Sequence, residues 1–262
     1  MIKPLAVLSA CLLLGACVTT GGGVSTLNIH NQSVTQIDAQ VFKAAQLPAP
    51  TVLVMHGCGG VDPHHLEWAK QLQDWGFNAV VVDSFKPRFV SSTCTKVMEV
   101  TPLQRAIDAH LTAKWVMTQE WSQRKVGVLG FSHGAWGALH ASTTQDAQRE
   151  IGASYLTSAV AFYPYCGSSL NFVGRGIPLQ IHIGGDDDWT PASLCKDLAR
   201  NWDLGANYFE YARAHHGFDR INTDQRISGT DGAIGMRTLR SDPEANKAAR
   251  RRVRDFLDQT LR

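Results

Sequence analysis

Apolar and polar residues alternate along this chain in two different rhythms. Six short runs, rich in β-branched residues, are apolar almost throughout and predict buried strands at residues 51–56, 77–83, 125–131, 158–163, 179–183 and 207–211. Between these runs lie stretches in which apolar residues recur at helical spacing. Strands that are apolar on both faces and alternate with helices are typical of a parallel sheet. The pattern therefore predicts an α/β fold with a mostly parallel central sheet and helices on both of its faces.

Capping residues and prolines locate the predicted helices. Asp62, followed by proline, predicts the start of a helix that ends at Gly76. Pro102 opens a longer helix in which Leu103 and Ile107 fall on one face. Three further helices are expected from about residue 133, over 192–204 and over 243–261. Residues 26–46 carry a weaker pattern and are expected to add one or two antiparallel strands at the sheet edge.

The length and charge of the chain narrow the class of protein. The chain has 262 residues, and α/β domains of about this size fold as one unit, so we expect one domain over residues 26–262. The formal net charge is only +2, and 44% of the residues are hydrophobic. These values argue against a disordered chain and against the strongly basic surface of a nucleic-acid-binding protein.

The N-terminal segment has the features of an export signal. A lysine precedes an apolar run that is too short to span a bilayer, and Leu14-Gly15-Ala16-Cys17 follows it. Small residues before a cysteine resemble the lipobox of bacterial lipoproteins. The resemblance implies a signal peptide over residues 1–16, a lipid anchor on Cys17 and a glycine-rich tether over residues 17–25. Val18 after this cysteine favours an outer-membrane lipoprotein facing the periplasm; the alternative is a soluble periplasmic or secreted protein.

Four further cysteines would then lie in an oxidising compartment, where disulfides form. Cys166 and Cys195 both follow predicted strands whose ends share one edge of the sheet, so we expect these two to pair. That pairing leaves Cys58 with Cys94. The alternative is four buried free thiols.

A nucleophile motif follows the strand predicted at 125–131. Gly130-Phe131-Ser132-His133-Gly134 matches the G-x-S-x-G elbow, in which a sharp turn between a strand and a helix exposes the serine hydroxyl. Composition alone produces such a pentapeptide in some chains, but the strand before it and the helix after it supply the required context. Ser132 is therefore the candidate nucleophile, and a tight turn without catalysis is the alternative reading.

A serine hydroxyl needs a base and a group that orients the base. His216 follows the last predicted strand and is the candidate base, with His215 as its competitor. Three aspartates follow the strand at 179–183, and of these we choose Asp187 as the acid. Asp186 is expected to stay solvated. Asp188 or Thr190 is expected to cap the helix that begins near Pro191.

Backbone N–H groups must receive the charge that develops on the carbonyl oxygen of a substrate. The glycine-rich loop His56-Gly57-Cys58-Gly59-Gly60 follows the first buried strand and is suited to present one such donor. We expect the N–H groups of Cys58 and His133 to form this oxyanion hole, and a flexible turn is the alternative reading of the loop.

With these residues identified, positions 50–260 resemble the dienelactone hydrolase family of the α/β-hydrolase fold. The glycine-rich loop, the elbow at Ser132, the aspartate four residues before Pro191 and His216-Gly217-Phe218-Asp219 occur in the order of that family. The resemblance implies hydrolysis of small-molecule esters or lactones through a covalent acyl-enzyme, without a metal or an organic cofactor. It also supports His216 over His215 and Asp187 over its neighbours.

The chain departs from this family at two positions. Ser132 stands where dienelactone hydrolases proper have a cysteine, and Gly57 stands where they have a glutamate. A thiol tuned by a carboxylate is therefore absent, which argues against dienelactone itself as the substrate.

Two further hypotheses about function and one about metal binding follow from the sequence. A serine peptidase would use the same three residues, and a non-catalytic envelope lipoprotein could keep the fold without turnover. The intact set of Ser132, His216 and Asp187 argues against the second of these. His64 and His65 lack a third ligand at suitable spacing, so we expect solvated histidines and no metal site there.

Overall fold

The computed structural model describes residues 24–28, 36–143, 151–167, 176–201, 206–228 and 236–262. The predicted signal peptide and Cys17 lie outside these residues, as does all of the predicted tether except its last two positions. No helix within the described ranges combines the length and the apolar character that crossing a membrane would require.

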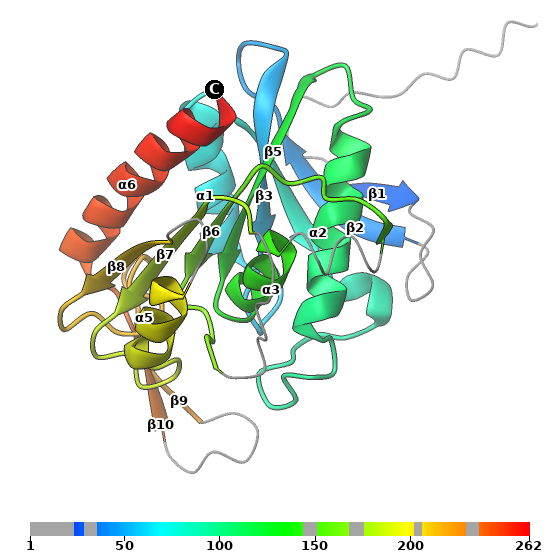
Figure 1. Ribbon diagram of the computed structural model, residues 1–262. Helices are drawn as coiled ribbons and strands as arrows, with labels where there is room; N and C mark the ends of the chain where they lie inside the picture. Colours follow the sequence, from blue (N-terminus) through cyan, green and yellow to red (C-terminus); the bar gives the residue numbers. More distant parts are fainter. Residues whose placement is uncertain (1–23, 29–35, 144–150, 168–175, 202–205, 229–235) are drawn as a thin grey trace, which may run out of the picture.

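An eight-stranded sheet forms the centre of the molecule (Figure 1). Its strands follow the order β1-β2-β4-β3-β5-β6-β7-β8. Their bounds are β1 Val24–Asn28, β2 Gln36–Phe42, β3 Ala49–Met55, β4 Asn78–Asp83, β5 Ser122–Phe131, β6 Ser158–Phe162, β7 Leu179–Gly184 and β8 Asn207–Tyr211. The strands from β4 to β8 pair in parallel, whereas β1 and β2 are antiparallel edge strands. The predicted α/β fold, including its antiparallel edge, is confirmed.

Helices cover both faces of this sheet. Those in the described residues are α1 Pro63–Asp74, α2 Pro102–Val116, α3 His133–Ser142, α5 Ala192–Arg200 and α6 Pro243–Leu261, with a short 3₁₀ turn, η1, at Lys86–Arg88. Figure 1 shows α1 and α6 side by side on one face, with α2 and α3 on the other. The guanidinium of Arg250 on α6 lies 4.2 Å above the ring of Trp68 on α1, which joins the two helices of the first face.

Capping residues set the helix starts that the sequence predicted. The carboxylate of Asp62 accepts the N–H of His64 at 3.1 Å at the start of α1, and the Thr101 hydroxyl accepts the N–H of Gln104 at the start of α2. These bonds satisfy backbone donors that have no partner within the helix.

The central strands are buried on both faces. Every residue of β3, β6 and β7 is buried, as the continuous apolar runs in the sequence predicted. All parallel strands end at the same edge of the sheet, so the loops that follow β3, β5, β7 and β8 meet there. This edge carries the candidate catalytic residues.

Four elements differ from the prediction. Strand β5 begins at Ser122, because Ser122 pairs with Ala49 before a register shift. Helix α5 ends at Arg200 in the described part of the chain, short of the predicted residue 204. A hairpin of β9 Asp224–Ser228 and β10 Met236–Arg240 lies where no strand was predicted.

Candidate active site

Ser132 occupies a strained turn between β5 and α3. Its backbone has φ 52° and ψ −116°, and residues other than glycine rarely adopt a positive φ. A Cβ at Gly130 would lie 2.3 Å from the carbonyl oxygen of Gly134, and a Cβ at Gly134 would lie 2.4 Å from those of Met55 and His56. Both positions therefore require glycine, which explains the spacing of the motif.

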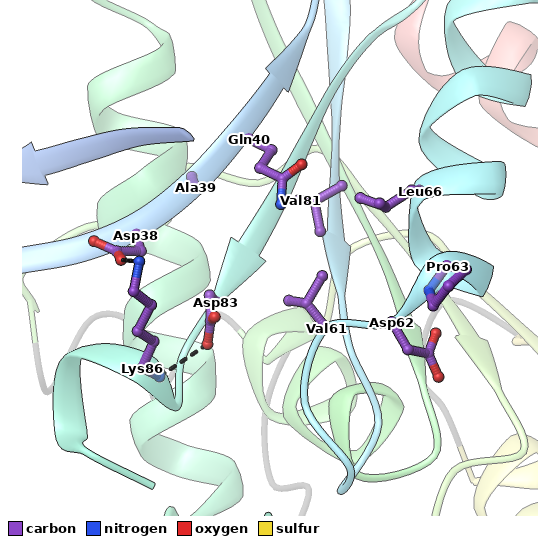
Figure 2. Close-up of a pocket in the computed structure, with 10 residues that line it drawn as sticks. All are labelled: Asp38, Ala39, Gln40, Val61, Asp62, Pro63, Leu66, Val81, Asp83 and Lys86. Carbon is purple, nitrogen blue, oxygen red and sulfur yellow. Dashed lines mark hydrogen bonds and ion pairs between the residues drawn. The ribbon is translucent and has the colours of Figure 1, made fainter. Parts of the chain in front are cut away.

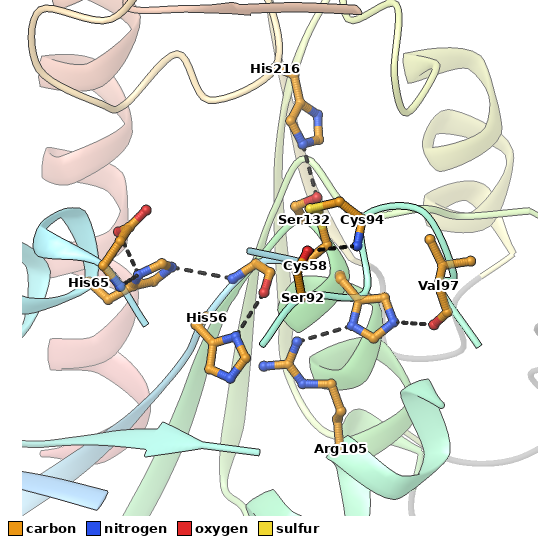
Figure 3. The surroundings of a disulfide bond; sticks show 12 residues. His56, Cys58, His65, Ser92, Cys94, Val97, Arg105, Ser132 and His216 are labelled. Carbon is orange, nitrogen blue, oxygen red and sulfur yellow. Dashed lines mark hydrogen bonds and ion pairs between the residues drawn. A yellow bond between two sulfur atoms is a disulfide. The ribbon is translucent and has the colours of Figure 1, made fainter. Parts of the chain in front are cut away.

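A chain of two hydrogen bonds joins three residues from separate loops. Nε2 of His216, after β8, lies 2.9 Å from the hydroxyl oxygen of Ser132, and Figure 3 shows the ring directed at that hydroxyl. Nδ1 of the same ring lies 2.9 Å from Oδ2 of Asp187, after β7. His216 and Asp187 are both buried, whereas Ser132 is partly exposed. The structure thus brings the predicted nucleophile, base and acid together.

The loop after β7 fixes the carboxylate of Asp187. Its Oδ1 accepts the N–H groups of Trp189 at 2.9 Å and Thr190 at 2.8 Å, and its Oδ2 accepts the Thr190 hydroxyl at 3.0 Å. Asp186 is exposed, as expected. The predicted helix cap is wrong: Asp188 instead accepts the N–H of Thr238 at 2.8 Å, and no side chain caps the start of α5. Among the three aspartates, only Asp187 meets the imidazole of His216.

The neighbouring side chains hold the ring of His216. The rings of Tyr163 and Trp189 have their centroids 4.5 and 4.9 Å from it. His215, the competing candidate, turns away, because its Nδ1 lies 2.9 Å from the carbonyl oxygen of Asp186. The geometry therefore favours His216 as the base.

A buried carboxylate to which sequence reasoning gave no role is hydrogen-bonded to Tyr163, the tyrosine that packs against this ring. Asp219 is fully buried and accepts hydrogen bonds from the Tyr163 hydroxyl at 2.9 Å, from Nε1 of Trp68 at 2.7 Å and from Nε2 of His64 at 2.7 Å. Burial by itself would raise the pKa of Asp219, but the three donors, with His64 foremost, hold this pKa below its ordinary value. Its place three residues after His216 in the same motif was the available signal.

Two histidines hold the backbone on the two sides of Gly57. Nδ1 of His56 lies 2.7 Å from the carbonyl oxygen of Gly57, and Nε2 of His65 accepts the N–H of Gly57 at 3.3 Å (Figure 3). In a planar trans peptide the N–H points opposite to the carbonyl. Because His56 binds the Gly57 carbonyl, the N–H of Cys58 in the same peptide points away from His56. A Cβ at Gly57 would lie 3.7 Å from Cβ of Ser132, so this loop borders the nucleophile.

The other predicted oxyanion donor, His133, begins helix α3. Its Nε2 lies 2.7 Å from the carbonyl oxygen of Val97, and its Nδ1 lies 3.0 Å from Nη1 of Arg105. Because an arginine can only donate, Nδ1 is the acceptor and Nε2 carries the proton. Burial, followed by the charge of Arg105, lowers the pKa of His133 to about 3, so the ring is neutral near pH 7.

Two disulfide bonds lie in the described part of the chain. Cys58 is joined to Cys94 and Cys166 to Cys195, which is the pairing that the sequence favoured. The first of these bonds attaches the glycine-rich loop to the segment that follows η1 (Figure 3). The candidate oxyanion donor Cys58 is thus covalently linked to a second loop.

The expectation of solvated histidines at the start of α1 is wrong. His64 is bonded to Asp219 and its ring packs 4.6 Å from that of Phe131, and His65 is also buried. Ligand atoms of Asp62, His64 and His65 lie within 4.8 Å of one another. Within this group the His65 ring contacts the carboxylate of Asp62 and accepts the N–H of Gly57 in the glycine-rich loop. The guanidinium of Arg220 donates to the same carboxylate at 2.9 Å. The cluster therefore ties α1 to the loops around the site.

A hollow of about 340 Å³ lies beside the start of α1 (Figure 2). Val61 and Asp62 border it on one side, and Lys86, paired with Asp38 at 2.7 Å, borders it on the other. None of the residues that line this hollow belongs to the Ser132, His216 and Asp187 set. The hollow is therefore separate from the reacting groups.

Several solved structures share this fold. A dienelactone hydrolase from Anabaena variabilis ATCC 29413 has 17% identity and a TM-score of 0.65, over 92% of this chain and 99% of that one. Propionate-bound esterase 2 of Thermogutta terrifontis has 15% identity and a TM-score of 0.68, over 92% and 94%. XC6422 from Xanthomonas campestris, a serine hydrolase without a lid, has 18% identity and a TM-score of 0.57, over 76% and 87%.

Sequence comparison identifies the family. No curated protein sequence matches the chain. The sequence model of the family described as "Dienelactone hydrolase family", in contrast, matches residues 37–261. These residues include the whole candidate site. This chain therefore belongs to the dienelactone hydrolase family, and its class is that of the carboxylic ester hydrolases.

Proposed function

We propose that this protein hydrolyses carboxylic esters or lactones through an acyl-enzyme on Ser132, with His216 as the base and Asp187 as the orienting acid. The observation that carries this proposal is the continuous hydrogen-bonded chain from Ser132 through His216 to Asp187, with both distances at 2.9 Å. Nucleophilic catalysis by serine needs this arrangement of nucleophile, base and orienting group.

In the first half of the reaction, the Ser132 hydroxyl attacks the acyl carbon while Nε2 of His216 takes its proton. The negative charge that develops on the carbonyl oxygen is received by the N–H groups of Cys58 and His133. His216 then gives the proton to the leaving alcohol oxygen, and the acyl group remains on Ser132.

In the second half, a water molecule attacks the acyl-enzyme and loses its proton to His216. The same two N–H groups receive the second oxyanion, and the collapse of this intermediate returns the proton to Ser132. The carboxylate of Asp187 stabilises the charged imidazole, and the N–H groups of Trp189 and Thr190, which donate to its Oδ1, hold it in position.

Support for an ester substrate comes from the family and from the residues near the nucleophile. The Thermogutta esterase of similar fold binds propionate and butyrate in its own structures. Gly57 leaves the space beside Ser132 free of a side chain, and no carboxylate stands there as in the dienelactone hydrolases proper. We therefore expect simple esters, in preference to dienelactone, as substrates.

A fluorophosphonate probe combined with ester turnover tests this function. The wild type should take one label and hydrolyse p-nitrophenyl esters, whereas Ser132→Ala should take no label and lose on the order of 10⁴-fold in kcat. Equal labelling of the two proteins would remove Ser132 from the role of nucleophile. Cleavage of peptides without cleavage of esters would favour a peptidase instead.

We also propose that the protein is exported and anchored in the outer membrane through Cys17. The two disulfides in the described residues support an oxidising compartment, because such bonds are rare in the reducing cytosol. Metabolic labelling with a palmitate analogue should mark the wild type and miss Cys17→Ala. Labelling of neither protein, with both recovered in the soluble periplasmic fraction, would favour a cleaved secretory signal.

A further inference from the structure

A short loop segment contacts both of the residues that would donate to the oxyanion. We call residues 93–97 the strap; it follows η1 and precedes α2. The strap forms a tight turn, because the N–H of Lys96 donates to the carbonyl oxygen of Thr93 at 3.1 Å. One end contacts Cys58 and the other end, at Val97, contacts His133; Figure 3 shows Cys94 beside Cys58 and Val97 further along the same segment.

The first end of the strap holds Cys58 at two points. The N–H of Thr93 donates to the carbonyl oxygen of Cys58 at 2.8 Å, and Cys94 forms the disulfide with the Cys58 side chain. The Cα atoms of the two cysteines are 4.8 Å apart. One covalent bond and one backbone hydrogen bond therefore restrain Cys58, the residue whose N–H is proposed to receive the oxyanion.

The second end of the strap holds His133. The carbonyl oxygen of Val97 accepts Nε2–H of the imidazole at 2.7 Å, while Arg105 donates to Nδ1 from the opposite side. Arg105 is fully buried and comes from α2, so it fixes the tautomer that the bond to Val97 requires. The strap thus bridges the two donor residues, Cys58 in the loop after β3 and His133 at the start of α3.

We propose that the strap is a positioning element of the oxyanion hole and that the Cys58–Cys94 disulfide sets the turnover number as well as the stability of the fold. This inference rests on the proposed function. Donors stabilise an oxyanion only if they are held in place before the reaction, because a donor that must reorient loses much of its advantage. Opening the disulfide would leave the N–H of Cys58 restrained only by hydrogen bonds.

The second disulfide supplies a matched control. Cys166 and Cys195 are 29 residues apart and Cys58 and Cys94 are 36 apart, so the two bonds close chain loops of similar length. Removing either bond should therefore relax the unfolded chain to a similar degree. Only Cys94→Ala, however, releases a donor residue; Cys166→Ala leaves the strap intact.

The test compares Cys94→Ala, Cys166→Ala and the wild type on p-nitrophenyl acetate. Cys94→Ala should lower kcat by about 10-fold or more with KM changed by less than about 3-fold, because the oxyanion forms only after binding. It should also weaken, by a similar factor, inhibition by a trifluoromethyl ketone, whose adduct with Ser132 carries an oxyanion. Cys166→Ala should keep kcat within about 2-fold of the wild type. Equal kcat and equal inhibition in the two variants would overturn the proposal.

Reduction of the wild type covers the case in which Cys94→Ala does not fold. Tris(2-carboxyethyl)phosphine is oxidised to its oxide while the disulfide gains two electrons and two protons, and peptide mass mapping reports which bond has opened. Activity should fall in step with the Cys58–Cys94 bond while circular dichroism stays native; full activity with that bond open would overturn the proposal. A wild type that takes no fluorophosphonate label and cleaves no ester would instead refute the proposed function.

Discussion

The Tyr163 hydroxyl donates a 2.9 Å hydrogen bond to Asp219, and the Tyr163 ring lies 4.5 Å from the imidazole of His216. The candidate base is therefore packed against a tyrosine whose position is set by a buried charge. Because His64 on α1 donates to the same carboxylate, this contact connects the helix layer to the loop that carries His216. Asp219 is not in contact with the reacting atoms; it positions the groups that hold them.

Replacing Asp219 by asparagine tests this arrangement. The amide keeps the size of the carboxylate but turns a donor toward Tyr163, Trp68 or His64, so at least one buried donor loses its acceptor. We expect Asp219→Asn to lower the free energy of unfolding by about 2 to 4 kcal/mol in urea denaturation. Tyr163→Phe, which removes one donor and keeps the ring, should cost about 1 to 2 kcal/mol. An Asp219→Asn protein as stable as the wild type would show that the carboxylate charge is unimportant.

His56 offers a second test, because two substitutions keep different parts of its ring. The nitrogen of asparagine is as many bonds from Cα as Nδ1 of histidine, whereas that of glutamine corresponds to Nε2. His56→Asn can therefore still donate to Gly57 and orient the Cys58 peptide, and His56→Gln cannot. We expect kcat on p-nitrophenyl acetate to be about 10-fold higher in His56→Asn than in His56→Gln. Identical rates in the two variants would contradict a role for the bond to Gly57.

The two glycines at positions 134 and 59 should respond differently to alanine. A Cβ at Gly134 would meet two backbone carbonyl oxygens at 2.4 Å, and backbone cannot move aside as a flexible side chain can. Gly134→Ala should therefore lose about 3 kcal/mol of stability or fail to accumulate as soluble protein. No atom lies within 4 Å of a Cβ at Gly59, so Gly59→Ala should stay within about 0.5 kcal/mol of the wild type. Thermal unfolding of both variants, measured side by side, decides the matter.

Buried neutral histidines predict that the protein loses stability in mild acid. Burial lowers the pKa of His110 to about 4 and that of His182 to about 3, both below the ordinary value of about 6.5. Between about pH 6.5 and pH 4, these two histidines therefore bind protons in the unfolded chain but not in the folded protein. Stability is fully present above about pH 6.5 and is lost as the pH falls toward 4, because protons pull the equilibrium to the unfolded state.

A single variant isolates one of these groups. His110 lies in α2, where its Nε2–H donates to the carbonyl oxygen of Ala141 at 2.9 Å, and the nitrogen of glutamine can make the same bond. His110→Gln should reduce the loss of unfolding free energy between pH 8 and pH 5 by roughly 2 kcal/mol. Urea denaturation at both pH values gives this difference. If the unfolding free energy of the wild type and of the variant changed equally between the two pH values, protonation of His110 would not be the cause of the acid sensitivity.

The sequence predicted the sheet and the three candidate catalytic residues because their signals are local. Continuous apolar runs identify strands that are buried on both faces, and the glycines around Ser132 reflect contacts that only a tight elbow produces. His216 and Asp187 could be chosen because each follows a predicted strand in the order that the fold requires. The position of an acid, base or nucleophile in this fold is largely determined by the strand that precedes it.

The residues that were misjudged depend on distant partners. His64 is polar and begins a helix, which by itself indicates solvent; its burial follows from Asp219, 155 positions later in the chain. The hairpin of β9 and β10 has polar residues on both faces, so no alternation marked it as strand. The bond from Arg105 to His133 joins two helices. The sequence predicted each helix but not how the two pack against each other.

The backbone at Gly57 has a consequence for how this scaffold could change its chemistry. A β-carbon there would lie 3.6 Å from the carbonyl oxygen of Phe131 and 3.7 Å from Cβ of Ser132, which are ordinary packing distances. The main chain is already shaped to accept a side chain against the nucleophile. One replacement at this position could narrow the acyl site or place a charge in it, and substrate preference could diverge within the family without any rebuilding of the loop.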